Sequence, residues 1–236
     1  MKRILTTLLI GLSLTVGTAS VTLAQDLQKG LEAARNGDFV TALQAWRPLA
    51  EQGAAAPQYN LGQLYRRGEG VTQDYKEAVK WYRLAAEQGH ADAQANLGSM
   101  YTKGWGVTQD YKEAVKWNRL AAEQGNAVAQ YTLGQMSRMG VGVTEDAKEA
   151  VKWYRLAAEQ GYTSAQANLG VLYGMGKGVI QDNVMAHMWG TLAASNGDEN
   201  GAGLRDWVKK EMTPTQLEKA RHLARECVRK NYKGCG

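Results

Sequence analysis

The stretch EAVKWYRLAAEQG, residues 77–89, is written almost letter for letter twice more, at residues 113–125 and 149–161. The copies lie 36 residues apart. A catalytic residue set is needed once in a chain, whereas a structural unit that stacks on its neighbours is needed several times. The repetition therefore predicts a repeat protein and not an enzyme.

Two columns of residues mark the ends of one helix in every copy. An Asp can cap the first free backbone amides of a helix, and a Gly can take the left-handed conformation that ends it. Glu77, Glu113 and Glu149 each follow an Asp by three residues, which predicts capping boxes. The Asp column is Asp38, Asp74, Asp110, Asp146 and Asp182, and the Gly column is Gly53, Gly89, Gly125, Gly161 and Gly197.

The other half of each unit predicts a second helix. It reads AQANLGSMYTKG at residues 93–104, where Ala93, Leu97 and Tyr101 share one face and Gly98 allows another helix to approach closely. A loop with two glycines, GEGVTQD at residues 68–74 and its equivalents, joins the two helices. No third glycine and no Lys-Ser/Thr pair follow, so we interpret the loop as a tight turn with a buried Val and not as a phosphate site.

The pattern LG..Y..G.GV..D...A..W...AA..G resembles the Sel1-like repeat, a relative of the tetratricopeptide repeat with its extra length in the glycine loop. Four good copies span about residues 55–197, and a degenerate copy spans residues 26–53. The resemblance implies an all-α, right-handed α-solenoid of stacked helix-turn-helix repeats. It also implies binding of a protein or peptide, commonly in exported bacterial proteins.

The first 24 residues read as a secretory signal peptide. They have a basic start, an apolar run and small residues ending at Ala24, after which we expect cleavage. The alternative is a membrane anchor, but the apolar run is shorter than the ~20 residues that span a bilayer. We therefore expect a signal peptide at residues 1–24, a repeat solenoid at 25–197, and a periplasmic or secreted protein without a membrane span after cleavage.

The C-terminal segment, residues 198–236, is expected to cap the array, with the 36-residue register ending after Gly197. Its sequence TPTQLEKARHLARECV predicts a helix that begins with Thr213 as cap, Pro214 at the first position and Gln216 closing a capping box. One predicted apolar stripe of this helix would cover the end of the array. The stripe consists of Leu217, Ala220, Ala224, Cys227 and Val228.

The net charge and the two cysteines bear on the kind of partner and on the cellular compartment. The formal charge of +5 is concentrated in the tail and is too small to argue for nucleic-acid binding by an exported protein. Cys227 and Cys235 are the two cysteines of the chain. We predict that they form a disulfide after export, and the alternative is two free thiols.

No arrangement of catalytic or metal-binding residues stands out. His90, His187 and His222 lack the spacing of zinc ligands, and the serine motifs of acyl-transfer enzymes do not occur. Cysteine-rich secreted members of the resembled family are described as penicillin-binding or β-lactamase-like, but they carry a cysteine pair in each repeat. We predict no enzyme, cofactor or metal, and keep such a hydrolase as the alternative function.

A column of tryptophans, Trp81, Trp117, Trp153 and Trp189, is interpreted as core packing; the alternative is a ladder for ligand stacking.

Positions that vary between otherwise similar units are free to suit a partner. On the first helix, Tyr and Arg recur with i, i+4, i+7 spacing, and both are favoured interface anchors. We expect stacking not to depend on this variable stripe, and drift on an exposed face is the alternative to binding. The predicted partner-binding residues are Tyr59, Gln63, Arg66, Ser99, Thr102, Tyr131, Gln135 and Arg138.

Overall fold

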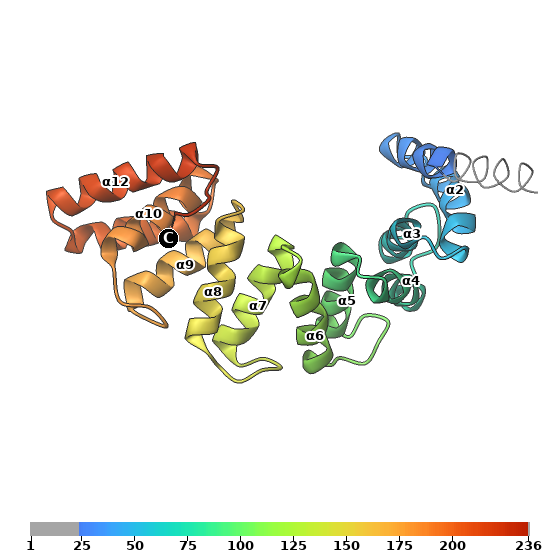
Figure 1. The fold of residues 1–236 in the computed structure, drawn as a ribbon, viewed down its shortest axis with the longest axis horizontal. Coiled ribbons are helices and arrows are strands. Elements are labelled where there is room, and N and C mark those ends of the chain that lie inside the picture. The colour runs from blue at the N-terminus through green and yellow to red at the C-terminus, as the bar shows by residue number, and fades with distance from the viewer. Residues whose placement is uncertain (1–23, 236) are drawn as a thin grey trace, which may run out of the picture. The chain divides into compact units, whose positions relative to one another are not determined.

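The computed structural model describes residues 24–235, which form helices and loops without a β-strand (Figure 1). Apart from Ala24, the predicted signal peptide lies outside the described residues. Residues 24–35 are helical. The elements that follow are α2 (Phe39–Glu51), α3 (Ala55–Arg67), α4 (Tyr75–Glu87), α5 (Ala91–Lys103), α6 (Tyr111–Glu123), α7 (Ala127–Met139), α8 (Ala147–Ala158), α9 (Thr163–Met175), α10 (Asn183–Ser195), α11 (Glu199–Val208), the 3₁₀ helix η1 (Lys209–Glu211) and α12 (Pro214–Arg229).

The helices begin at steps of 36 residues, in two series. First helices of the repeats begin at Ala55, Ala91, Ala127, Thr163 and Glu199, and second helices begin at Phe39, Tyr75, Tyr111, Ala147 and Asn183. This regularity confirms an all-α fold of stacked helix pairs.

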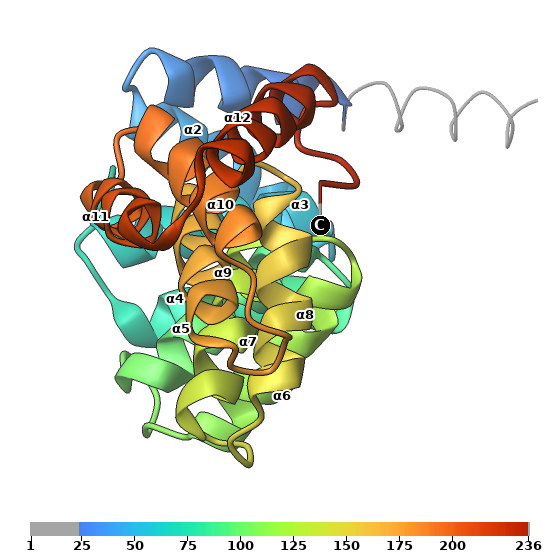
Figure 2. The ribbon, with the colours of Figure 1, turned by 90° about the vertical axis from the view of Figure 1, so that its left-hand side faces the viewer.

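The expectation that the register ends after Gly197 is wrong. Helix α11 begins in register and packs on α9 and α10 (Figure 2). Its Asp198 caps the helix, and its buried Gly201 and Val208 stand at the positions of Ala165 and Leu172 in α9. The sequence hid this relation because ENGAGLRDWV lacks the Leu-Gly pair and the Tyr of the repeat pattern.

The aspartates cap the second helices as predicted, but the capping boxes predicted in these helices are wrong. Asp110 Oδ1 accepts hydrogen bonds from the amides of Lys112 and Glu113, at 2.9 and 3.1 Å. The Asp110 amide already donates to the carbonyl of Tyr101, 3.1 Å away. Glu113 therefore does not reach back, and its carboxylate accepts from Trp117 Nε1 at 3.1 Å. The predicted capping box of Thr213 and Gln216 in α12 is confirmed.

The glycine loops pack each repeat onto its predecessor. Gly142, with φ of 72°, lies so close to the start of α6 that a Cβ there would be 2.4 Å from the carbonyl oxygen of Tyr111. A side chain would clash with backbone as well as strain the left-handed conformation, so the position requires glycine. Val143 in the same loop is half-buried against the core of unit 2, not fully buried as expected.

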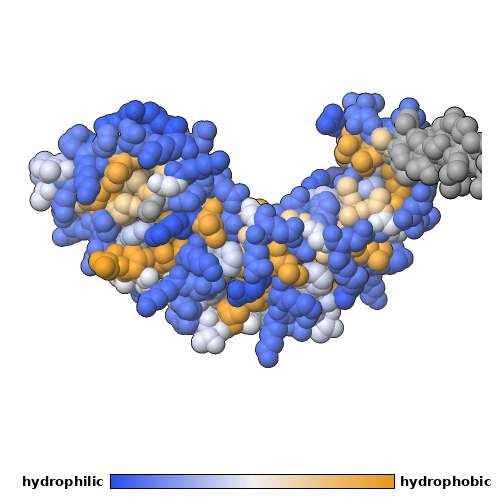
Figure 3. Space-filling model, viewed as in Figure 1, coloured by the Kyte–Doolittle hydropathy of each residue, from blue (hydrophilic) through white to orange (hydrophobic). Residues whose placement is uncertain are grey.

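The chain divides into two compact units. Unit 1 runs to residue 93 and includes residues 104–108; unit 2 holds residues 94–103 and the chain from residue 109. The four tryptophans of the column are at most 7% exposed, which confirms core packing over a ligand ladder. Lys80, Lys116 and Lys152 pair with glutamates on the outer faces of their own helices. Some apolar surface remains visible in both units among hydrophilic side chains (Figure 3).

Helix α12 packs on α10 and its tail folds back. Ala220, Ala224 and Cys227 are buried and Leu217 is half-buried, but Val228 is 50% exposed, so its expected place in the buried stripe is wrong. Each residue turns a helix by about 100°, which carries Val228 past the buried edge that Cys227 occupies.

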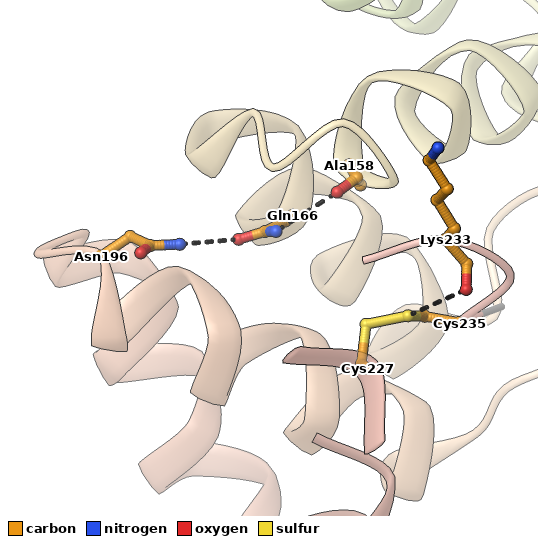
Figure 4. The surroundings of a disulfide bond; sticks show 6 residues. All are labelled: Ala158, Gln166, Asn196, Cys227, Lys233 and Cys235. Atoms are coloured by element: carbon orange, nitrogen blue, oxygen red, sulfur yellow. Dashed lines mark hydrogen bonds between the residues drawn. A yellow bond between two sulfur atoms is a disulfide. The ribbon is translucent and has the colours of Figure 1, made fainter. Parts of the chain in front are cut away.

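Cys227 and Cys235 form the predicted disulfide, with their Cα atoms 5.4 Å apart (Figure 4). The tail between them places Tyr232 against the core of unit 2, beside Gly161.

Each repeat also holds a buried glutamine that connects three helices. Gln130, 3% exposed, donates from Nε2 to the carbonyl of Ala122 at 3.0 Å, and its Oε1 accepts from Gln160 Nε2 at 2.7 Å. It thereby joins α7 to the ends of α6 and α8. Gln166 makes the equivalent bonds to Ala158 and Asn196 (Figure 4). This glutamine recurs in four successive repeats, as Gln58, Gln94, Gln130 and Gln166, a signal that was present in the sequence but not used above.

Candidate functional site

In unit 1 the predicted stripe is tied to the second helix of its own repeat. Gln63 Nε2 donates to the Tyr59 hydroxyl at 3.0 Å, and the Tyr82 hydroxyl donates to Gln63 Oε1. Arg66 Nε donates to the Tyr82 hydroxyl at 3.2 Å. Burial raises the pKa of Tyr82 to about 12. The Tyr59 ring stacks on His90 with centroids 4.7 Å apart, so four half-buried side chains form one network with the buried Tyr82.

Unit 2 has part of this arrangement on α7 and α8, where the buried Tyr154 hydroxyl has no hydrogen-bond partner among the described residues. Gln135 Nε2 donates to the Tyr131 hydroxyl at 2.9 Å, and the Tyr131 ring lies 5.8 Å from that of Tyr154. A Cβ on Gly134 would be 2.5 Å from the Tyr154 ring, so glycine permits this close approach. In α6, which follows the stripe residues Ser99 and Thr102, the position of Tyr154 is held by the buried Asn118.

A repeat whose stripe carries Tyr and Arg thus has a Tyr at the facing position of its second helix, Tyr82 or Tyr154, whereas the repeat with Ser99 and Thr102 has Asn118 there. The stripe therefore contacts the second helix of its own repeat, while the independence of stacking between repeats stays a prediction.

Two neighbouring hollows run along α9 in unit 2. One has a volume of about 270 Å³ and the other about 310 Å³. Both are lined by Asn168 and Val171, so they form one continuous surface, which we call the α9 groove. Its lining residues are Tyr131, Arg138, Glu145, Ala147, Ser164, Ala167, Asn168, Val171, Leu172, Met175, Lys177, Asp198 and Asn200.

One end of the α9 groove is polar and aromatic. Burial is the main cause of the raised pKa of Tyr131, which keeps its phenol protonated and able to donate a hydrogen bond. Tyr162 flanks the Tyr131 ring at 4.9 Å. Asp198 Oδ1 accepts from the Gly201 amide at 2.7 Å, and Asn168 Nδ2 donates to the Ser164 carbonyl at 2.8 Å. These bonds hold the lining side chains in place.

The other end combines charges with exposed apolar surface. Arg138 and Lys177 line it together with Glu145, and Met175 is 57% exposed. Glu145 stands where other repeats have a glutamine whose amide closes the loop, as Gln109 Nε2 does by donating to the Thr102 carbonyl at 2.8 Å. A carboxylate cannot donate that bond. Its side chain instead contributes to the groove.

Unit 1 contains a hollow of about 350 Å³ at equivalent repeat positions. Its Asn60, Gln63 and Leu64 lie three repeats before Asn168, Val171 and Leu172 of the α9 groove. Arg67 and Glu69 likewise precede Met175 and Lys177. The hollow is therefore a feature of the repeat, while its charges differ between the two units.

The predicted stripe residues have different roles. Tyr131 and Arg138 line the α9 groove, and Gln63 lines the hollow of unit 1. Gln135 holds the Tyr131 hydroxyl, and Tyr59 and Arg66 belong to the Tyr82 network. Ser99 and Thr102 are half-buried in α5, where Thr102 Oγ1 donates to the Gly98 carbonyl at 2.9 Å.

The groove residues contributed by α9 and by the repeat of α11 were not among the predicted binding residues. Asp198 and Asn200 come from the repeat whose register was expected to be lost. In α11, Trp207 stands one repeat after Val171 and is 51% exposed. Its ring lies against Gly174, where a Cβ would be 3.3 Å from the ring. Extending the stripe column that contains Val171 by one further step of 36 residues would have identified Trp207.

Within residues 24–235, no cluster of three or more His, Cys, Asp or Glu side chains could hold a metal ion. In the same range, no helix combines the length and apolar character needed to cross a membrane. The penicillin-recognising alternative gains no support from the described residues.

Stacked helix pairs joined by glycine loops, with a groove along the first helices, define the α-solenoid class of repeat proteins. The family model of the Sel1 repeat matches residues 58–90, 91–126, 127–162 and 163–198, more than half of the chain. The chain belongs to the Sel1 repeat family. Members of this family are generally scaffolds for protein interactions.

Solved structures agree with this assignment. The chain is 36% identical to c5321, a protective antigen of uropathogenic Escherichia coli with an SLR fold, at a TM-score of 0.82; the match covers 90% of this chain and 47% of the antigen. The chain thus spans about half the length of that relative. A Sel1 repeat protein from Oxalobacter formigenes is 32% identical at a TM-score of 0.70, with 83% of this chain and 84% of the relative covered. No functionally curated protein matches the chain.

Proposed function

We propose that this protein is an exported scaffold that binds a peptide segment of a partner protein in the α9 groove. The observation that carries the proposal is the recurrence of the hollow at equivalent repeat positions in both units. A surface that recurs in two repeats with different side chains suits recognition of an extended partner.

The composition of the α9 groove indicates how such a segment would bind. Val171 and Met175 offer apolar surface to a partner side chain, while Tyr131 and Arg138 can bond to backbone carbonyls or carboxylates. Tyr, Arg and Trp are over-represented among residues that dominate binding energy, and the exposed Trp207 adds a third such side chain in α11.

Site-specific photocrosslinking in the native host tests the proposal. A photoreactive amino acid replaces Met175 in the groove or, as the control, Lys148 on the exposed face of the second helix α8. We expect a discrete protein adduct at position 175 and none at position 148. Arg138→Glu combined with Lys177→Glu should reduce that adduct by ~10-fold or more, because the interface would lose two cations and gain two anions.

The matched control for that charge reversal is Lys112→Glu with Lys148→Glu, which makes the same change on exposed second-helix positions. Equal adducts from positions 148 and 175, or equal loss in both double variants, would place binding on another surface. A nitrocefin assay on the same purified protein examines the hydrolase alternative, for which we expect no turnover.

Export is part of the proposal. Its support is the leader-like sequence of residues 1–24, the Cys227–Cys235 disulfide and the similarity to an antigen. We expect protein recovered from its native compartment to begin at Gln25 and to carry no alkylatable thiol without reductant. Intact-mass analysis after alkylation measures both; an unprocessed chain with two free thiols would refute export.

A further inference from the structure

A separate hollow in unit 2, of about 430 Å³, lies between α10 and α12 and shares no lining residue with the α9 groove. Its apolar surface comes from Leu192 of α10 and from Ala224 and Val228 of α12. Val228 is 50% exposed although neighbouring Cys227 is buried. The α10 and α12 part of unit 2 shows apolar surface bordered by hydrophilic side chains (Figure 3).

The polar groups of this hollow are already satisfied or positively charged. Thr191 Oγ1 donates to the carbonyl of His187 at 2.8 Å, and Ser195 Oγ donates to that of Leu192 at 2.8 Å, so neither hydroxyl needs a ligand for its proton. The rim carries Arg225 and Arg229, one helical turn apart on α12.

The two arginines leave an excess of positive charge. Arg229 pairs with Glu226 at 2.8 Å, whereas Arg225 has no ion-pair partner among the described residues. Side chains at i and i+4 stand close enough on a helix to hold one anion together. An apolar floor next to the guanidinium group of Arg225, which no described carboxylate neutralises, favours a ligand with an apolar group beside a negative charge.

We infer that the hollow between α10 and α12 binds the C-terminus of a partner polypeptide that ends in a large aliphatic residue. In a terminal residue, the side chain and the carboxylate are attached to the same Cα, the shortest spacing that a peptide offers. The aliphatic side chain covers Val228 and Ala224, and the carboxylate accepts hydrogen bonds from Arg225 and Arg229.

The test uses the full mature chain and a dye-labelled pentapeptide, Ser-Gly-Ser-Leu-Leu, with a free C-terminal carboxylate. We expect fluorescence anisotropy to show saturable binding that falls by ~10-fold or more when the carboxylate is amidated or the last Leu is replaced by Ser. Amide NMR of labelled protein should show the largest shifts at Leu192, Ala224 and Val228.

Arg225→Gln combined with Arg229→Gln should weaken binding of the free-acid peptide by a similar factor. The matched control is Lys219→Gln with Lys230→Gln, which removes the same charge from exposed positions outside the hollow. No saturable binding, equal binding of acid and amide, equal loss in both double variants, or shifts confined to the α9 groove would each overturn the inference. Sedimentation with phosphatidylglycerol vesicles that depends on both arginines, without peptide binding, would overturn it in favour of a membrane surface.

Discussion

Single polar residues inside the stack determine how successive helices are positioned. Gln130 bonds to a carbonyl at the end of one helix and to an amide group that follows another, so it connects three consecutive helices. A buried amide stabilises one arrangement over others because any shift would leave its own polar atoms without hydrogen bonds. The equivalent bonds of Gln58 and Gln166 show that this connection recurs with the repeat.

Gln130→Leu should lower the free energy of unfolding by about 1 kcal/mol, because it removes the hydrogen bonds of this buried amide to the Ala122 carbonyl and the Gln160 amide. Urea denaturation followed by circular dichroism measures the change. The control is Gln52→Leu at the exposed end of α2, for which we expect a change within ~0.5 kcal/mol. Equal effects of the two substitutions would show that the buried bonds contribute nothing net.

At the scale of elements, α10 is the helix that α9, α11 and α12 all contact. Its His187 is 4% exposed, and burial lowers the pKa of the imidazole, followed by the repulsion of Arg205, Arg221 and Lys209. The folded state therefore binds the His187 proton more weakly than the unfolded chain does, whose histidine pKa is about 6.5. This difference contributes stability at neutral pH.

That contribution should be complete above pH ~6.5 and be lost progressively as the pH falls towards the lowered folded-state pKa of His187, because the unfolded state takes up the proton first. The urea midpoint should therefore drop between pH 7.5 and pH 5. His187→Gln should flatten this dependence, whereas substitution of the exposed His222 by Gln should leave it unchanged. A dependence that persists unaltered in His187→Gln would assign the effect to other groups.

At the scale of the whole molecule, each repeat covers the apolar face of its neighbour, so the ends of the array need separate covering. In unit 2, α12 does this for α10: Ala224 and Cys227 belong to the same core cluster as Leu192 and Trp189. The disulfide then holds the tail, with Tyr232, against that cluster. The outermost helix and the tail thus stabilise this end as one assembly.

A chain that ends at residue 212 should lose protection from amide hydrogen exchange in α9 and α10, while α3 and α4 of unit 1 keep theirs. Contacts in a repeat array are made with near neighbours, so the loss should decay with distance along the chain. Hydrogen-exchange mass spectrometry of both chains measures this. Uniform loss of protection throughout the chain would mean that the array unfolds as a single unit.

Residue types and their spacing were enough to predict the helix pairs, their Asp caps and glycine ends, the buried tryptophans and the cysteine pairing. These features depend on residue type at short spacing, and the repeat writes each signal several times. The tertiary structure decided the rest: Glu113 bonds to Trp117 because Tyr101 already accepts the amide of Asp110, and α11 extends the array despite its weak sequence pattern. It also determined which side chains line the α9 groove and that Val228 stays exposed. Both depend on which helices lie beside a residue, and the spacing of residues in the sequence does not specify that.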